Sequence, residues 1–151
     1  FSKIGELKYL KMVIQESMRL HPPFWFENRN AMHDVELGGV RIKKGSMIAI
    51  SRYALHRNTD YWDDPETFDP NRFNEESSGE NSGVNSFAYQ PFSSGPRVCI
   101  GRHFAMMEMM IILCSMMQRY KFRVDPHYKH KVATNLTMEP KGGLPVILER
   151  R

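Results

Sequence analysis

One cysteine of the sequence lies where its surroundings could hold it as a thiolate. Residues 92–101 read Phe-Ser-Ser-Gly-Pro-Arg-Val-Cys-Ile-Gly, and Cys99 directly precedes a segment with helical periodicity. A thiolate in that place faces the positive end of the helix dipole and unpaired backbone N–H groups, and both lower its pKa. Cys99 is therefore a candidate metal ligand. Taken alone, however, a cysteine at a junction between loop and helix is usually a small buried hydrophobe.

The residues around Cys99 suit a flat cofactor that carries carboxylates. Gly95 and Gly101 allow the backbone to turn sharply and to lie close against a ring. Arg97 can pair with a carboxylate, and Phe92 can cover the sulfur and exclude water. The stretch as a whole predicts a cofactor site with a cysteine ligand.

A second set of charged residues has a spacing that allows contact. Glu16 and Arg19 are three residues apart, so they lie on the same face of a helix. An exposed pair of this kind is commonplace and by itself indicates no function. Residues 70–73 read Pro-Asn-Arg-Phe and supply a further arginine, Arg72.

The elements that must position these residues alternate between helix and short strands. Apolar residues at helical spacing predict a helix over residues 4–20, which ends at His21-Pro22-Pro23 because proline lacks the N–H donor. Residues 35–37 and 40–42 predict a hairpin around a Gly-Gly turn, and residues 47–50 predict another strand. Residues 58–90 lose regular periodicity and predict a long irregular segment.

A second long helix is predicted from about residue 100 to residue 120. We expect its packed face to consist of Phe104, Met107, Ile111, Cys114 and Met117. Cys114 and the clustered methionines of this helix are interpreted as packing residues. Short strands are predicted at residues 121–124, 136–139 and 145–149. The predicted fold class is α+β, mainly α, with two long helices, short antiparallel strands and a long irregular meander.

Composition excludes few classes of function. The 151 residues are 41% apolar and 25% charged, as in ordinary soluble globular proteins. A net charge of +4 could favour an acidic protein partner but gives no argument for nucleic acid. The two cysteines form neither a disulfide framework nor a zinc spacing, and the composition leans toward a reducing compartment. No signal peptide or apolar run long enough to span a bilayer is present, and the chain opens at Phe1 without an initiator methionine.

Residues 92–101 resemble the cytochrome P-450 signature, in which Phe, Gly, Arg, Cys and Gly are fixed. All five positions are met, by Phe92, Gly95, Arg97, Cys99 and Gly101. The segments around Glu16 and Arg72 match the family's Glu-x-x-Arg and Pro-x-Arg-Phe motifs in the family's order, although Asn71 stands where many relatives carry glutamate. The resemblance covers essentially the whole chain, so we expect residues 1–151 to be the C-terminal haem-binding portion of a single cytochrome P-450 domain.

The resemblance implies a role for each of several residues. Cys99 would be the ligand of the iron in haem b (iron protoporphyrin IX). The other cofactor-binding residues would be Phe92, Gly95, Arg97, Ile100, Gly101 and Arg29, and the substrate pocket would include Phe24, Trp25 and Phe26. Glu16, Arg19 and Arg72 would form a buried charge cluster. This cluster would hold residues 92–101, here called the cysteine loop, and would take no part in the chemistry. His56 is interpreted as bonded to backbone rather than to a propionate, and residues 134–136 as a hairpin tip near substrate.

The resemblance also implies an activity and partners. The parent protein would be a haem-thiolate monooxygenase that inserts one atom of dioxygen into a lipophilic organic substrate. The alternatives are a haem-thiolate isomerase or peroxygenase, which needs no electron donor, and an inactive haem-binding fragment. An electron-donor protein (ferredoxin, flavodoxin-like or diflavin reductase) would dock beside Arg102 and His103, and no nucleic acid is expected. The protein would reside in the cytoplasm or on the cytosolic face of a membrane.

The oxygen-activating acid and alcohol of the family have no counterpart in these residues. We expect them before Phe1, together with most of the substrate pocket. The chain would then supply the cysteine side of the haem site and would not catalyse monooxygenation by itself.

Overall fold

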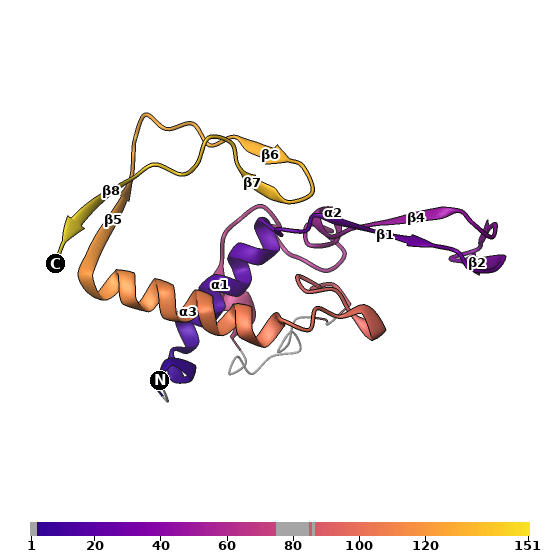
Figure 1. The fold of residues 1–151 in the computed structure, drawn as a ribbon, viewed down its shortest axis with the longest axis horizontal. Coiled ribbons are helices and arrows are strands. Elements are labelled where there is room, and N and C mark those ends of the chain that lie inside the picture. The colour runs from indigo at the N-terminus through magenta and orange to yellow at the C-terminus, as the bar shows by residue number, and fades with distance from the viewer. Residues whose placement is uncertain (1–2, 75–84, 86) are drawn as a thin grey trace.

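The computed structural model describes residues 3–74, 85 and 87–151 of the chain. Two helices that pack against each other form its centre, and paired strands extend from them (Figure 1). The first helix, α1, spans Lys8–Leu20 after a short 3-10 turn, η1, at Ile4–Glu6, and the second, α3, spans Arg102–Arg119. Between them lie a single helical turn, α2, at Arg52–Leu55 and two further 3-10 turns, η2 at Pro70–Phe73 and η3 at Gly95–Arg97.

The strands of the described residues form four separate antiparallel pairs. Strand β1 (Phe26–Asn30) pairs with β4 (Met47–Ser51), and β2 (Val35–Leu37) pairs with β3 (Val40–Ile42) at the far end of the same arm (Figure 1). After α3, β5 (Tyr120–Val124) pairs with β8 (Val146–Arg150), and β6 (Val132–Thr134) pairs with β7 (Met138–Pro140). The β2–β3 turn needs glycine, because φ is +56° at Gly38 and +78° at Gly39, values that two-residue hairpin turns favour.

Helix α1 contributes to two apolar clusters. Met12 packs with Trp62, Phe73 and Ala88, which come from the long segment between β4 and the cysteine loop. Ile14 and Met18 pack with Met110 of α3, and Phe92, Met106 and Met109 lie against them. These contacts fix both the meander and the start of α3 on α1.

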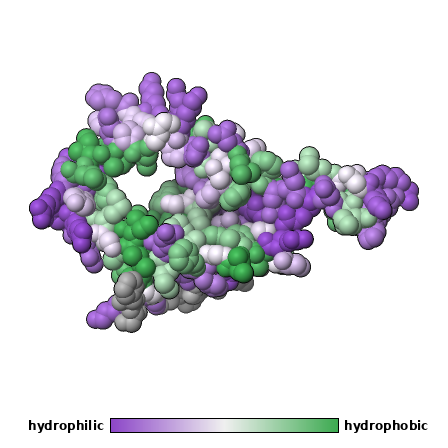
Figure 2. All heavy atoms as spheres, viewed as in Figure 1, coloured by the Kyte–Doolittle hydropathy of each residue, from purple (hydrophilic) through white to green (hydrophobic). Residues whose placement is uncertain are grey.

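The predicted packed face of α3 was wrong. Met106, Met109 and Met110 face α1, whereas Phe104 is 73% and Met107 60% exposed. Of the methionines interpreted as packing residues, Met116 and Met117 are also exposed. Apolar residues occur all around this helix, so periodicity could not indicate which side meets α1. Apolar surface is prominent over α3 and the neighbouring C-terminal strands, whereas the β1–β4 arm is mostly hydrophilic (Figure 2).

The other elements agree closely with expectation. The helix predicted over residues 4–20 is divided by Leu7 into η1 and α1. Strand β7 begins two residues later than predicted, at Met138. Strand β1, the helical turn α2 and strand β6 were not predicted. Between Asn58 and Gln90 the described residues hold η2 and otherwise irregular backbone. No described helix combines the length and apolarity that crossing a bilayer would require.

Candidate functional site

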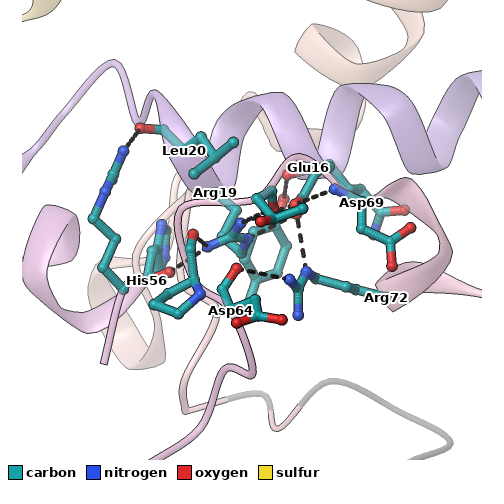
Figure 3. Close-up of polar contacts among 12 residues, drawn as sticks. Glu16, Arg19, Leu20, His56, Asp64, Asp69 and Arg72 are labelled. Carbon is teal, nitrogen blue, oxygen red and sulfur yellow. Dashed lines mark hydrogen bonds and ion pairs between the residues drawn. The ribbon is translucent and has the colours of Figure 1, made fainter. Parts of the chain in front are cut away.

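The carboxylate of Glu16 and the guanidinium of Arg19 form a bidentate pair inside the protein (Figure 3). Both side chains are fully buried, and Arg19 donates through Nε at 2.7 Å and through Nη2 at 2.8 Å to the two carboxylate oxygens. Helical geometry places them on one face of α1, and that face is covered by the meander. Parallel hydrogen bonds of this kind are among the stronger charge-assisted contacts.

Arg19 also gathers the backbone of three distant residues. Its Nη1 donates to the carbonyl oxygen of His56 at 2.8 Å and to that of Pro65 at 2.7 Å. Its Nη2 donates to the carbonyl oxygen of Thr67 at 3.2 Å. The guanidinium lies over the ring of Trp62, 5.0 Å from its centroid. One side chain of α1 therefore holds the chain from residue 56 to residue 67 in place.

Arg72 reaches the same carboxylate with a longer contact. Its Nε lies 3.5 Å from Glu16 Oε1 without hydrogen-bond geometry, and its Nη2 donates to the carbonyl oxygen of Asp64 at 3.0 Å. Glu16 Oε1 also accepts the backbone N–H of Asp69 at 2.9 Å. Asn71, which departs from the family pattern, donates its side-chain amide to Asp69 and so stays outside the cluster. The structure thus brings the three predicted members together, with Arg72 as the least buried.

His56 connects the charge cluster to the cysteine loop. Its side chain is fully buried, and Nε2 accepts the backbone N–H of Gln90 at 3.0 Å. Because Nε2 accepts, the proton of the neutral ring is on Nδ1, which has no partner among the described residues. Burial lowers the pKa of His56 to about 4. A backbone contact with Arg19 opposes this shift, and the nearby positive charges of Arg19, Arg52 and Arg57 add to it. The ring is therefore a neutral acceptor near pH 7.

The cysteine loop closes on itself through backbone hydrogen bonds. The N–H of Cys99 donates to the carbonyl oxygen of Phe92 at 2.9 Å, and the N–H of Val98 donates to that of Gly95 at 3.0 Å. Gly95 has a φ of +68°, in the region that side chains other than glycine rarely adopt. Phe92 packs toward α1 and α3 and so fixes one end of the loop to the core.

The tip of this loop fits a flat ring bound through sulfur. Cys99 is exposed, and Ile100 beside it is fully exposed, so apolar surface lies next to the thiol. A Cβ at Gly101 would lie in van der Waals contact with Cys99 Sγ, at 3.9 Å, so Gly101 lies directly beside the sulfur. Arg97 is exposed on the same loop and has no hydrogen bond or ion pair with any other residue that the structure describes. A haem needs one thiolate from the protein and presents two carboxylates, so these residues fit it.

Metal binding by several side chains finds no support in the described residues. Within residues 3–74, 85 and 87–151, no group of three or more His, Cys, Asp or Glu side chains could hold a metal ion. Cys114, the other cysteine, is half-buried on α3 and accepts a weak hydrogen bond from Gln118 at 3.6 Å.

Arg29 lies on β1 and is linked to the loop through a residue that sequence reasoning missed. Its Nη2 lies 3.1 Å from Glu27 Oε1, and its Nη1 donates to the carbonyl oxygen of Asn28. The Glu27 carboxylate also accepts the hydroxyl of Ser93 and pairs with the buried Arg52. Only Glu27 and Arg29 are close in sequence, so no local pattern could have shown that these four residues meet.

The aromatic residues predicted to line the substrate pocket lie near the β6–β7 turn. Trp25 Nε1 donates to the carbonyl oxygen of Asn135 at 3.1 Å, and the backbone N–H of Met138 donates to that of Pro23 at 2.7 Å. The rings of Trp25 and Phe26 are 4.3 Å apart, and Phe24 is half exposed. The structure therefore brings together the two segments, residues 24–26 and 134–136, that were predicted to approach substrate.

Arg102 and His103, predicted to contact an electron donor, lie at the start of α3 and are exposed. They border a groove of about 550 Å³ between α1, α3 and residues 89–93. The floor of this groove includes Met18, Phe92 and Met110. Positive charge therefore borders an apolar hollow directly behind the cysteine loop.

Comparison with known proteins gives consistent matches over nearly the whole chain. The family model described as Cytochrome P450 matches residues 1–145. Cytochrome P450 3A18 of Rattus norvegicus is 37% identical over 140 residues, which are 93% of this chain and 27% of that protein. The 11-oxo-beta-amyrin 30-oxidase of Medicago truncatula is 34% identical over 148 residues, which are 97% of this chain and 28% of that protein.

A solved structure shares the fold. The crystal structure of a cytochrome P450 (CYP102L1) superposes with a TM-score of 0.86 at 34% sequence identity. That match covers 100% of this chain and 33% of the other. The chain therefore spans less than a third of the length of the first curated relatives that it matches.

Proposed function

The chain belongs to the cytochrome P450 family, as its sequence motifs indicated, and on that premise we propose that Cys99 is the haem ligand of a monooxygenase. Proteins of this family bind haem b through a cysteine thiolate. The proposed reaction places one oxygen atom of O2 into a C–H bond of a lipophilic substrate. The other atom becomes water with two electrons from a donor protein and two protons.

The observation that carries this proposal is an exposed thiol on a loop whose ends are both fixed. Phe92 anchors one end in the core, and α3 begins immediately after Gly101 at the other. The backbone bond between Cys99 and Phe92 closes the loop between these anchors. A sulfur held in this way can bind one face of a flat ring without rearrangement of the loop, which keeps the entropic cost of binding low.

The residues of this chain would each have a separate task. Arg97 and Arg29 would pair with the haem carboxylates. Gly95 and Gly101 would leave room for the ring, Ile100 would place apolar surface against it, and Phe92 would shield the sulfur from water. When bound, haem supplies the oxygen chemistry, and thiolate ligation favours cleavage of the O–O bond. Glu16, Arg19 and Arg72 would hold the loop and take no part in the reaction.

Partners are proposed from the chemistry of two surfaces. The basic residues Arg102 and His103 at the mouth of the groove suit an acidic electron-donor protein. Phe24, Trp25 and Phe26 form an aromatic segment that suits a lipophilic substrate. One relative, 11-oxo-beta-amyrin 30-oxidase, is named for the oxidation of an organic compound, which supports substrates of that broad kind.

Paired cysteine variants test the ligand assignment. In the full-length, haem-loaded protein, reduction under carbon monoxide should give the red-shifted Soret band of thiolate ligation. Cys99→Ser should abolish this band, and Cys114→Ser, the matched control, should retain it. A Cys99→Ser protein that keeps the band would overturn the assignment.

We assign only the cysteine side of the haem site to residues 1–151. The relatives that carry the activity are more than three times as long as the matched segment, and a haem covered on one face leaves the other to water. Residues 1–151 expressed alone with haem, a reductase and NADPH should therefore give no substrate-dependent product. Turnover comparable to that of a full-length relative would contradict this division of labour.

A further inference from the structure

Glu27 lies at the junction between the β1–β4 arm and the cysteine loop. Its carboxylate accepts the hydroxyl of Ser93 at 3.1 Å and 3.2 Å on its two oxygens. The same carboxylate pairs with Nη2 of Arg29 at 3.1 Å and with Nη2 of Arg52. A single side chain of β1 therefore contacts the strand's own arginine, the first residue of α2 and the beginning of the cysteine loop.

Arg52 contacts both Glu27 and the chain just before the cysteine loop. Its side chain is 3% exposed, and its Nε donates to the carbonyl oxygen of Gln90 at 2.7 Å. The N–H of the same residue, Gln90, is held by His56. Arg52 thus fixes the chain at Gln90, just before the cysteine loop, and Glu27 fixes it again at Ser93. Pro91 and Phe92 lie between these two fixed residues.

The charges of Glu27, Arg29 and Arg52 leave Arg29 able to bind an anion. Glu27 carries one negative charge between two arginines, so the three side chains sum to +1. Arg52, which is the more buried of the two arginines, neutralises the carboxylate from inside. Arg29, 39% exposed, is left with its charge available to an anion from outside. A carboxylate beside Arg29 therefore orients that guanidinium without cancelling the attraction for a ligand carboxylate.

The protonation state of Glu27 agrees with this role. Partial burial by itself would raise its pKa, but Arg52, the Ser93 hydroxyl and Arg29 together hold the pKa of Glu27 below its usual range. The carboxylate is therefore ionised at neutral pH.

We propose that Glu27 is a positioning residue of the haem site, which fixes Arg29 and the Ser93 end of the cysteine loop in the arrangement that haem requires. This inference rests on the proposed function, in which Cys99 and Arg29 hold haem. Glu27 touches neither the iron ligand nor the ring in this arrangement. It acts through Ser93 on the loop and through the ion pair on Arg29.

The serine contact gives the sharper test, because Ser93→Ala leaves the buried Glu27–Arg52 pair intact. Ser94→Ala, one residue further along the loop, removes a hydroxyl that, among the described residues, bonds to the side chain of Gln90 and not to Glu27, and so serves as the matched control. In the full-length, haem-loaded protein, Ser93→Ala should speed haem transfer to apomyoglobin about tenfold, as loss of a residue that orients a ligand typically does. Ser94→Ala should change it less than about twofold.

The carboxylate itself is tested by Glu27→Gln against Asp34→Asn. Asp34 also pairs with a lysine and accepts a backbone N–H, but it immediately precedes β2. Glu27→Gln should speed haem transfer about ten- to a hundredfold. It should also leave a larger fraction of the reduced, carbon monoxide-bound protein without the thiolate Soret band. Asp34→Asn should change neither quantity.

Each outcome decides between the inference and the function on which it rests. If Ser93→Ala and Glu27→Gln release haem as slowly as their controls, the positioning role is wrong while Cys99 stands. Glu27→Gln could instead lower the melting temperature without changing haem release or the Soret band. That result would show that the Glu27 contacts serve only the stability of the fold, and it would also overturn the positioning role. If Glu27→Gln fails to fold, Ser93→Ala decides. Retention of the thiolate band in Cys99→Ser would instead refute the proposed function.

Discussion

The backbone N–H of Gln90 donates a 3.0 Å hydrogen bond to Nε2 of His56, a fully buried imidazole 34 positions earlier in the chain. The carbonyl oxygen of the same histidine accepts from Arg19. His56 therefore connects the buried charge cluster of α1 to Gln90, two residues before the cysteine loop. Loss of its acceptor nitrogen would remove the bond to Gln90 and leave the backbone contact with Arg19 in place.

Acidification should weaken the protein through His56. Burial lowers its pKa from 6.5 to about 4, so the unfolded chain takes up this proton first as pH falls. Neutral His56 makes its full contribution to the free energy of unfolding above pH 6.5. This contribution is lost progressively as the pH falls to about 4, for a total of roughly 3 kcal/mol.

Melting temperatures measured between pH 7 and pH 4 check this expectation. His56→Gln should flatten the pH dependence over that window, because the titrating group is gone. His33→Gln, a change at an exposed histidine, should leave it unaltered. An equally steep loss of stability in His56→Gln and in the wild type would show that other groups are responsible.

The Glu16–Arg19 pair should be expensive to break. Glu16→Ala strands a fully buried guanidinium, and such a loss costs about 3–5 kcal/mol. We therefore expect little folded, haem-loaded protein from this variant. Glu66→Ala breaks an ion pair with Arg57 in which the carboxylate is 71% exposed, and it should cost less than about 1 kcal/mol. A stable Glu16→Ala holoprotein with a normal spectrum would contradict the structural role.

Arg72 should contribute less than Arg19 to the same cluster. It is 15% exposed and contacts Glu16 at 3.5 Å without hydrogen-bond geometry. Arg72→Ala should therefore cost about 1–2 kcal/mol, mainly from the lost bond to Asp64. Thermal denaturation of Arg72→Ala and of Arg19→Ala ranks the two arginines, and equal losses of stability would show that the longer ion pair matters as much as the bidentate one.

Trp25 should hold the β6–β7 turn against the segment that follows α1. Trp25→Phe deletes the indole N–H that donates to Asn135 and keeps most of the aromatic surface. A neutral hydrogen bond contributes about 1 kcal/mol, so amide exchange across residues 132–140 should accelerate about fivefold. Phe24→Leu, which alters a half-exposed neighbour, is the control. Unchanged exchange in Trp25→Phe would mean that the bond between Met138 and Pro23 suffices.

The sequence by itself determined the features that depend on near neighbours. The signature around Cys99 identified the family, because its fixed residues lie within ten positions. Helix α1 and the β2–β3 hairpin were predictable because apolar spacing and a Gly-Gly turn act over a few residues. The pairing of Glu16 with Arg19 follows from one helical turn.

Only the tertiary structure decided which distant groups meet. The methionine, isoleucine and leucine side chains of α3 point to all sides of the helix. The side that packs on α1 therefore depends on where α1 lies and not on periodicity. Glu27 and Ser93 are 66 positions apart, and neither stands in a pattern that names the other. Their contact exists because β1 pairs with β4 while Arg52, just beyond β4, bonds to Gln90. Local spacing constrains a residue's own element, whereas contacts between elements are set by how the whole chain packs.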